Sequence, residues 1–339
     1  MRLTPLVRAA ASAVPRGNFT RLTSNDLAEF ERIVGDDHVR TTEIENYATD
    51  WTRQMRGSPA AVLLPESTEE VSALLRHCAK RGIAVVPQGG RTGLVGGATP
   101  VHDEEADTKI APDGYMMPLD LGAKGSCQIG GCLAAGAGGI RLLRYGSLHS
   151  HLLGVTMVDG AGRVLELGGR LRKDNTALHA AQLAIGSEGQ LGVITRATMS
   201  VVPRPSSILS AMLAVTRYEQ CLAILSLARR KLGEVLSSFE LIDAESMRAC
   251  SDNLQLKNVL DGKHPFYLLV ETHGSNSGHD GEKLMAFVEE ALGAELAVDG
   301  IVAQNETERN YMWRLRYVHN VNNFRRPGKH NTTSFYRCV

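Results

Sequence analysis

The stretch VVPQGGRTGLVGG, residues 85–97, carries five glycines within nine residues, directly after a short apolar run. Glycine lets a backbone adopt positive φ and approach a ligand closely, and successive backbone amides can form an anion-binding nest. A dinucleotide fingerprint needs glycines at i, i+2 and i+5, and a P-loop needs Gly-Lys followed by Ser or Thr. The stretch has neither spacing. Its residues alone leave two interpretations open, a structural turn or a phosphate site of another kind.

Regular elements are predicted immediately before this glycine loop. Residues 60–64 (AAVLL) predict a strand, and Ser67 with Glu70 forms a capping box that opens a helix with apolar residues at helical spacing. Gly82 is placed to end that helix as a C′ residue. Residues 83–86 (IAVV) predict a second strand, which would put the glycine loop at a strand's carboxyl end, where α/β sheets bind ligands.

The chain beyond the loop divides into two regions of different character. Residues 101–115 are acidic and poor in large apolar side chains, and they predict a loop. Residues 154–168 predict two strands around a turn, and residues 185–195 predict a turn followed by a strand. Pro203 and Pro205 mark a domain boundary.

Helices and strands alternate after this boundary, which predicts an α+β domain. The expected elements are a helix over 218–233, a strand over 265–272 and a helix over 278–293. The first helix is expected to place Leu222, Leu225 and Ala228 on one face and to end at Gly233. Periodicity is lost at the end of the chain, so residues 325–339 predict a disordered tail.

Composition limits the function classes. Lys+Arg and Asp+Glu both number 37 in the 339-residue chain, so nothing in the net charge favours nucleic-acid binding. No apolar run is long enough to span a membrane. The cysteines form no C-x-x-C pair, which leaves zinc and thioredoxin-type sites without support. They are Cys78, Cys127, Cys132, Cys221, Cys250 and Cys338.

The first 25 residues differ from the rest of the chain. They contain Arg2, Arg8, Arg16 and Arg21, and the first acidic residue is Asp26. Alanine and hydroxyl residues without a long apolar core are typical of a mitochondrial transit peptide. The alternative is a disordered basic tail.

Five motifs in order extend the argument from the glycine loop to most of the chain. PQGGRTGLVGG (87–97) is followed by PLDLGAKGSCQIGG (118–131), AGGIRLLRYGSLH (137–149), LRKDNT (171–176) and IGSEGQLGVIT (185–195). In this order the chain resembles the FAD-binding flavoproteins of the vanillyl-alcohol oxidase type, and among them the mitochondrial 2-hydroxy acid dehydrogenases. The resemblance runs from about residue 26 to residue 316.

The resemblance implies an α+β fold in which a two-subdomain FAD-binding domain is followed by a partial α+β substrate (cap) domain. The expected limits are 1–25 for the transit peptide, 26–206 for the FAD-binding domain, 207–324 for the partial cap domain and 325–339 for the tail. Compared with the family, the FAD-binding domain is shortened near 103–116.

The resemblance also implies the residues that bind FAD. Backbone amides of the glycine loop would hold the pyrophosphate, a second group would lie beside the flavin, and a third near the adenosine end. These groups are Pro87, Gln88, Gly89, Gly90, Thr92, Gly93, Gly96 and Gly97; Gly130, Gly131, Gly138, Gly139, Tyr145 and Gly146; and Gly186, Glu188, Gly189, Val193 and Ile194. The loop contains no histidine, so the FAD is expected to be non-covalent.

The implied activity is oxidation of D-2-hydroxyglutarate to 2-oxoglutarate in the mitochondrial matrix, with the electron-transferring flavoprotein as partner. D-lactate or glycolate is the alternative substrate. Arg316, in MWRLR (312–316), matches an arginine that contacts a substrate carboxylate in the family, and the guanidinium fork suits that role. The alternative is an arginine on a helix surface.

The chain also departs from the family. After Arg316 the family continues with a His-rich stretch and a Glu-His pair that supply the metal ligands and the base. Residues 319–339 carry neither, so no metal site is predicted and the catalytic residues stay unassigned. Cys132 and Gly136 stand where the family has asparagines. These departures predict impaired turnover, or a non-catalytic fragment of such an enzyme.

Overall fold

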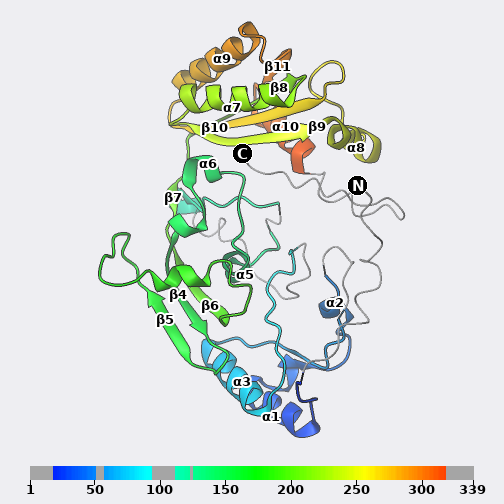
Figure 1. Ribbon diagram of the computed structural model, residues 1–339, viewed down its shortest axis with the longest axis vertical. Helices are drawn as coiled ribbons and strands as arrows, with labels where there is room; N and C mark the ends of the chain where they lie inside the picture. Colours follow the sequence, from blue (N-terminus) through cyan, green and yellow to red (C-terminus); the bar gives the residue numbers. More distant parts are fainter. Residues whose placement is uncertain (1–17, 51–56, 94–110, 123–124, 318–339) are drawn as a thin grey trace. The chain divides into compact units, whose positions relative to one another are not determined.

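The computed structural model describes residues 18–50, 57–93, 111–122 and 125–317 (Figure 1). They belong to two compact units. Unit 1 comprises Met1–Lys109, Ala123–Ala137 and Leu148–Val201, and unit 2 comprises Ile110–Gly122, Gly138–Ser147 and Val202–Val339. Both units mix helices with antiparallel strands, so the predicted α+β class is confirmed. No helix in the described residues is both long and apolar enough to cross a bilayer.

Unit 1 begins with two helices that share a small core. Helix α1 (Ser24–Val34) packs against α3 (Thr68–Arg81) through side chains that include Phe30 and Leu74. The predicted start of α3 is confirmed, because Ser67 Oγ accepts a hydrogen bond from the Glu70 amide at 3.1 Å. The Glu70 carboxylate accepts from the amide of Glu66. Gly82 ends the helix in the left-handed region, as predicted.

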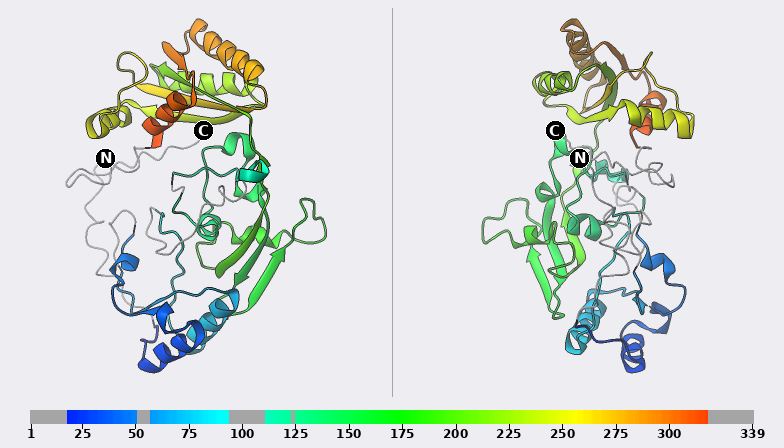
Figure 2. Two further views of the ribbon diagram at one scale, coloured as in Figure 1. Left: turned by 180° about the vertical axis from the view of Figure 1, so that it is seen from behind. Right: turned by 45° about the vertical axis from the view of Figure 1, so that its right-hand side comes forward.

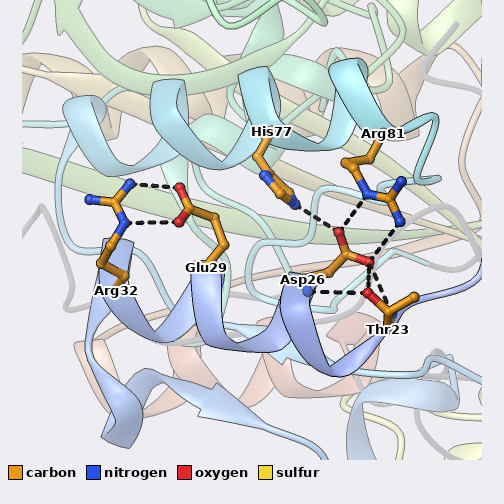
Figure 3. Close-up of polar contacts among 6 residues, drawn as sticks. All are labelled: Thr23, Asp26, Glu29, Arg32, His77 and Arg81. Atoms are coloured by element: carbon orange, nitrogen blue, oxygen red, sulfur yellow. Dashed lines mark hydrogen bonds and ion pairs between the residues drawn. The ribbon is translucent and has the colours of Figure 1, made fainter.

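Asp26 joins the two helices through a group of hydrogen bonds (Figure 3). Its carboxylate accepts from Arg81 Nε at 2.8 Å and lies 2.9 Å from His77 Nε2, both on α3. It also accepts from the Thr23 amide and hydroxyl, and Thr23 in turn caps α1. These hydrogen bonds hold the pKa of Asp26 well below its usual range. The bond from Arg81 has the largest effect, followed by those from Thr23 and His77.

Replacing Asp26 by asparagine is therefore expected to lower the melting temperature at neutral pH. It should also make the melting temperature fall less as the pH is lowered. A carboxyl whose pKa is lowered in the folded state stabilises the fold above its unfolded value, here 3.8, and this stabilisation is lost as the pH falls through the folded value. Thermal unfolding at neutral pH and at about pH 3 measures both effects. Asp37→Asn, at an exposed position, is the control, and equal shifts in the two variants would contradict the assignment.

The region between α1 and the glycine loop is less regular than predicted. Strands β1 (Val39–Arg40) and β2 (Val62–Leu63) form a two-stranded antiparallel sheet, so the strand expected over 60–64 is confirmed in its centre. A short helix, α2 (Glu45–Ala48), lies between them in sequence. The second predicted strand, over 83–86, is wrong: Val86 is 66% exposed, and no strand among the described residues pairs with this segment to satisfy its backbone.

The rest of unit 1 is a three-stranded antiparallel sheet with strand order β5-β4-β6. The hairpin predicted over 154–168 is confirmed as β4 (Leu152–Val158) and β5 (Val164–Gly168), and the strand predicted to end 185–195 is β6 (Val193–Met199). Helix α5 (Ile129–Ala134) lies beside β6. His151 is buried, with its Nδ1 3.2 Å from Ser200 Oγ.

Unit 2 is built on a four-stranded antiparallel sheet with strand order β11-β8-β10-β9 (Figures 1 and 2). Its strands are β8 (Ser207–Val215), β9 (Leu236–Asp243), β10 (Phe266–Gly274) and β11 (Asp299–Val302). Its helices are α7 (Tyr218–Lys231), α8 (Ala244–Leu254), α9 (Ser277–Gly293) and α10 (Glu306–Tyr317). The elements predicted over 218–233, 265–272 and 278–293 are thereby confirmed.

The four-stranded sheet is covered on both faces. Along β8, Leu213 and Val215 point into a core with α7 and α9, whereas Met212 points into a core with α8 and α10. Helix α7 buries Ile224 and Leu225, but Leu222 is 41% exposed, so the predicted inward orientation of Leu222 is wrong. Leu222 and Leu225 are three residues apart, a spacing that does not by itself say which face of the helix is buried. Packing against the sheet buries the face that carries Ile224.

Short elements complete unit 2. A 3₁₀ turn (Ala111–Asp113) leads into β3 (Tyr115–Met116), which pairs with β7 (Val202–Pro203). The last residue of the loop predicted over 101–115, Tyr115, therefore lies in β3. Residues 101–110 of that loop lie outside the described part of the chain. Helix α6 (Leu142–Tyr145) contacts β9. The predicted tail over 325–339 and residues 1–17 of the predicted transit peptide also lie outside the described residues.

Candidate functional site

Three of the segments predicted to bind FAD are in direct contact within unit 1. A Cβ built on Gly90 would lie 2.1 Å from the Ser126 carbonyl oxygen, so only glycine allows the loop to rest on the segment before α5. On the other side of the loop, Gly189 adopts φ +79°, and its Cβ would lie 2.7 Å from Pro87 Cγ. The structure thus brings residues 87–93, 126–131 and 186–189 together.

Three glycines of these segments have no described neighbour at their Cβ positions. A Cβ added to Gly93, Gly131 or Gly186 would meet no described atom within 4 Å. Large apolar side chains of these segments, such as those of Ile129 and Leu191, are 37% and 50% exposed. Close contacts at Gly90 and Gly189, uncrowded glycines nearby and exposed apolar side chains fit a ligand that has both phosphate and ring surfaces.

The backbone amides of the glycine loop suit an anion. In the described part of the chain, those of Gly89, Gly90 and Gly93 donate no hydrogen bond to protein. The loop is instead held by side chains: Gln88 Nε2 donates to the Tyr47 carbonyl at 3.3 Å, and Arg91 donates to the Asn46 carbonyl. The side chain of Gln88, a predicted cofactor residue, therefore holds the loop against Tyr47, and its role toward a cofactor stays a prediction.

The predicted adenosine-end residues have defined structural contacts. The amides of Gly186 and Glu188 donate to the Leu133 and Ala134 carbonyls, both at 2.9 Å, which ties this turn to the end of α5. Gly130 lies against Ile194, since its Cβ would be 3.3 Å from the Ile194 carbonyl oxygen. Val193 packs against the core of Val71, Leu75 and Val158, so its side chain is structural.

The other predicted FAD residues that the structure describes lie mostly in unit 2. Gly138, Gly139, Tyr145 and Gly146 belong to unit 2, where Gly139 lies against Asp120: a Cβ on it would be 2.9 Å from the Asp120 amide nitrogen. Gly96 and Gly97 lie outside the described residues. Thr92 is described as part of the loop, without regular structure.

Arg316, the predicted substrate clamp, forms a buried ion pair. Its Nη2 lies 2.7 Å and its Nε 2.8 Å from Glu240 Oε2, with the side chains 11% and 4% exposed. Burial raises the pKa of Glu240, and the charge and hydrogen bonds of Arg316 oppose this rise. The guanidinium is thus held by a carboxylate of the protein, and its role as a substrate ligand stays a prediction.

A second buried polar group, which the sequence analysis missed, lies on the α10 side of the same sheet. Glu271 and His273 of β10 are two residues apart and share this face, with His273 Nε2 3.0 Å from Glu271 Oε1. Glu271 Oε2 accepts from Trp313 Nε1 at 2.5 Å and from Ser210 Oγ at 3.3 Å. The signal in the sequence is a Glu and a His two residues apart, directly after the apolar run FYLLV (266–270).

Tyr145 and Arg141 complete this group. The Tyr145 hydroxyl lies 2.9 Å from His273 Nδ1, and Arg141 Nη2 lies 2.7 Å from Asp120 Oδ2. Burial raises the pKa of Glu271, but the hydrogen bonds and charge of His273, the Trp313 N–H and the Arg141 charge outweigh it, and the pKa is lowered overall. Tyr145, predicted beside the flavin, is therefore connected to a buried His–carboxylate pair.

A cysteine, Cys132, stands at one of the positions where the family has asparagine. Cys132 is buried in α5, and the effect of its nearby thiol lowers the pKa of Cys127 to about 7 although burial raises it. Within the described residues, no group of three or more His, Cys, Asp or Glu side chains is arranged to hold a metal ion. The expected absence of a metal site stays a prediction.

Comparisons with known proteins match both the N-terminal and the C-terminal parts of the chain. The model of the FAD binding domain family matches residues 59–105 and 100–168, and that of the C-terminal domain of FAD linked oxidases matches residues 204–335. The chain is 41% identical to the mitochondrial D-2-hydroxyglutarate dehydrogenase of Arabidopsis thaliana over 91% of this chain and 61% of that protein. It is 42% identical to the Bos taurus protein of that name, over 89% and 61%.

A yeast relative is covered more fully. The D-2-hydroxyglutarate–pyruvate transhydrogenase of Saccharomyces cerevisiae is 32% identical over 92% of this chain and 71% of its own length. The first seven curated relatives are covered over 61–64% of their lengths. The chain therefore spans just under two thirds of those proteins.

Solved structures share the fold. Alkyldihydroxyacetonephosphate synthase superposes with a TM-score of 0.68 at 17% identity, over 91% of this chain and 67% of that one. The 4-ethylphenol oxidase of Gulosibacter chungangensis gives 0.58 at 17% identity, over 87% and 68%. The chain belongs to the family of FAD-linked oxidases that contains the mitochondrial D-2-hydroxyglutarate dehydrogenases.

Proposed function

We propose that this protein binds FAD without a covalent link and oxidises D-2-hydroxyglutarate to 2-oxoglutarate. The observation that carries the proposal is the contact among three glycine-bearing segments of unit 1, with open space beside Gly93, Gly131 and Gly186. FAD, when bound, supplies the acceptor for the hydride that leaves C2 of the substrate. The unpaired amides of the glycine loop would hold its pyrophosphate.

The substrate class rests on the relatives and on Arg316. Relatives near 40% identity are named D-2-hydroxyglutarate dehydrogenases. Arg316 would contact a substrate carboxylate, which requires it to exchange Glu240 for the ligand or to bind both. Since the sequence pattern after Arg316 lacks the family's metal ligands and base, turnover by this chain is proposed to be slow, and a non-catalytic FAD-binding fragment is the alternative.

A mitochondrial location is supported by the same relatives, several of which are named mitochondrial. The matrix, and the electron-transferring flavoprotein as acceptor, are proposed from the resemblance of the sequence motifs. The transit peptide is proposed over residues 1–25, a range that includes the Thr20 amide, which donates to the Gly82 carbonyl at 2.8 Å, and Thr23, which caps α1. Cleavage after residue 25 would remove both contacts.

Anaerobic mixing of the flavin-loaded protein with D-2-hydroxyglutarate tests the activity. Loss of the visible flavin absorbance is expected, at a rate below one turnover per second, because typical enzymes with complete sites reach about 1–10³ s⁻¹. The L enantiomer is the control. Equal bleaching by both enantiomers, or by neither, would contradict the proposal.

D-lactate is a second candidate substrate. One relative, from Schizosaccharomyces pombe, is 41% identical over 88% of this chain and is provisionally named a mitochondrial D-lactate dehydrogenase. D-lactate has one carboxylate and D-2-hydroxyglutarate has two. Faster bleaching by D-lactate would therefore transfer the assignment to the monocarboxylic acid.

A further inference from the structure

Cys127 and Cys132 of unit 1 are neighbouring thiols that the proposed function does not use. Helix α5 begins after its N-cap residue Gln128, so Cys127 stands directly before the cap and Cys132 at the fourth position of the helix. Apolar side chains at these two positions commonly pack against each other, and cysteine behaves as a small apolar side chain. The structure agrees, because each thiol shifts the pKa of the other, which requires the two to be close.

The two thiols differ in their access to solvent and in their acidity. Cys127 is partly exposed, whereas Cys132 is 8% exposed. The nearby Cys132 thiol lowers the pKa of Cys127, while the Cys127 thiol and burial raise the pKa of Cys132. A peroxide reacts with the thiolate form of a cysteine that it can reach. Cys127 therefore has the properties of an attacking thiol, with Cys132 beside it as the thiol that can close a disulfide.

Other cysteines of the described chain contrast with this pair. Cys78, Cys221 and Cys250 are buried, and burial raises the pKa of each to about 11. Structural thiols that are buried in this way are inert toward oxidants. A peroxide is therefore expected to react at Cys127 before it reacts at any of these three.

We propose that Cys127 and Cys132 are a peroxide-oxidised thiol pair that closes into a disulfide at the backbone supporting the glycine loop. In the first step the Cys127 thiolate attacks hydrogen peroxide: an S–O bond forms, the O–O bond breaks, and hydroxide takes up a proton to leave as water. The Cys127 sulfur, oxidised by two electrons, is then a sulfenic acid. In the second step the Cys132 sulfur attacks it: the S–S bond forms, the S–O bond breaks, and hydroxide leaves with the Cys132 proton as water.

The position of Cys127 connects this oxidation to the glycine loop. A Cβ built on Gly90 would lie 2.8 Å from Cys127 Cα as well as 2.1 Å from the Ser126 carbonyl oxygen, so the loop rests on this segment. Closing the disulfide draws Cys127 toward Cys132 and displaces atoms that are packed against Gly90. The disulfide form is therefore expected to bind FAD about 5-fold to 150-fold more weakly, a consequence that rests on the proposed function.

Mass spectrometry of the full chain tests the thiol pair. Residues 125–141 form one tryptic peptide that holds both cysteines. After limited treatment with hydrogen peroxide, and blocking of free thiols in denaturant, this peptide is expected to have lost two hydrogen atoms and to carry no blocking group, whereas the peptides of Cys78, Cys221 and Cys250 are blocked. A reductant should restore both thiols. A pair that stays reduced overturns the proposal, and so does a disulfide from either thiol to Cys338.

Two variants assign the roles of the thiols. Cys132→Ala, which keeps a good helix former in α5, should stop at the sulfenic acid of Cys127, detected as its dimedone adduct. Cys127→Ser should leave Cys132 unoxidised. Oxidation of Cys132 in Cys127→Ser at the wild-type rate would contradict the assigned order.

FAD titration of the reduced and the disulfide forms measures the effect on the glycine loop. The double variant Cys127→Ser/Cys132→Ala is the matched control, and peroxide should not change its affinity for FAD. Equal affinities of the two wild-type forms would refute the connection to the loop. If the reduced wild type binds no FAD, the proposed function fails, and the mass of the 125–141 peptide alone decides whether the pair forms a disulfide.

Discussion

Replacing Arg316 by alanine is expected to lower the free energy of unfolding by about 3–5 kcal/mol at neutral pH, the cost of leaving one partner of a buried ion pair. Glu240 would remain in the sheet with its side chain 4% exposed and no guanidinium beside it. Urea or thermal unfolding monitored by circular dichroism measures the loss. The effect does not depend on FAD, so it can be read in the flavin-free protein.

The free energy of unfolding that is lost in Arg316→Ala should become smaller in acid. A carboxyl whose pKa is raised in the folded state favours folding below its unfolded pKa, 4.5 for Glu240, and this contribution is lost as the pH rises through the folded value. Removing Arg316 takes away the group that opposes the rise. The pKa of Glu240 would then increase further, and Arg316→Ala would be most destabilised at neutral pH.

Two controls separate the ion pair from general effects on α10. Arg314→Ala changes an exposed residue of the same helix and should alter stability by less than about 0.5 kcal/mol. The double variant Glu240→Leu/Arg316→Met removes both charges and should recover much of the loss. A single Arg316→Ala variant as stable as Arg314→Ala would show that the pair contributes nothing.

Gly131→Ala is expected to have opposite effects on stability and on FAD binding. The position is inside α5, and a Cβ there would meet no described atom within 4 Å. Alanine should raise the stability of the flavin-free protein by about 0.5–1 kcal/mol through helix propensity. The added methyl would occupy space proposed for FAD, and overpacking of about 1–3 kcal/mol corresponds to an affinity weaker by roughly 5-fold to 150-fold.

Gly293→Ala provides the matched control. A Cβ added to this glycine would also meet no described atom within 4 Å, but the residue lies in α9 of unit 2. It should leave FAD affinity unchanged. Gly90→Ala, whose Cβ would lie 2.1 Å from the Ser126 carbonyl oxygen, should reduce both stability and affinity. If Gly131→Ala binds FAD as tightly as Gly293→Ala, the open side of α5 is not the cofactor site.

The parts of the fold that were predicted are those with local signals. Ser67 and Gly82 mark the ends of α3 because capping depends on neighbouring backbone. Strand β8 was missed because both of its faces are buried, which makes its sequence a continuous apolar run without alternation. The strand predicted over 83–86 had the right composition, but pairing depends on a partner far away in sequence.

The candidate site divides in the same way. The glycine loop could be recognised because its conformational requirement lies in the residues themselves. Its contact with the segment before α5 could not, since this depends on tertiary packing between Gly90 and Ser126. Glu271 and His273 were overlooked because a strand pattern says which face a residue occupies, not which residue of α6 or α10 lies opposite.

The visible absorption spectrum of the purified full chain, recorded after free flavin is removed, tests the proposed FAD site most directly. The contacts among residues 87–93, 126–131 and 186–189 predict a protein-bound flavin spectrum, which is released on denaturation as expected for non-covalent FAD. A folded protein that is colourless, and stays colourless after incubation with added FAD, would contradict the proposed site.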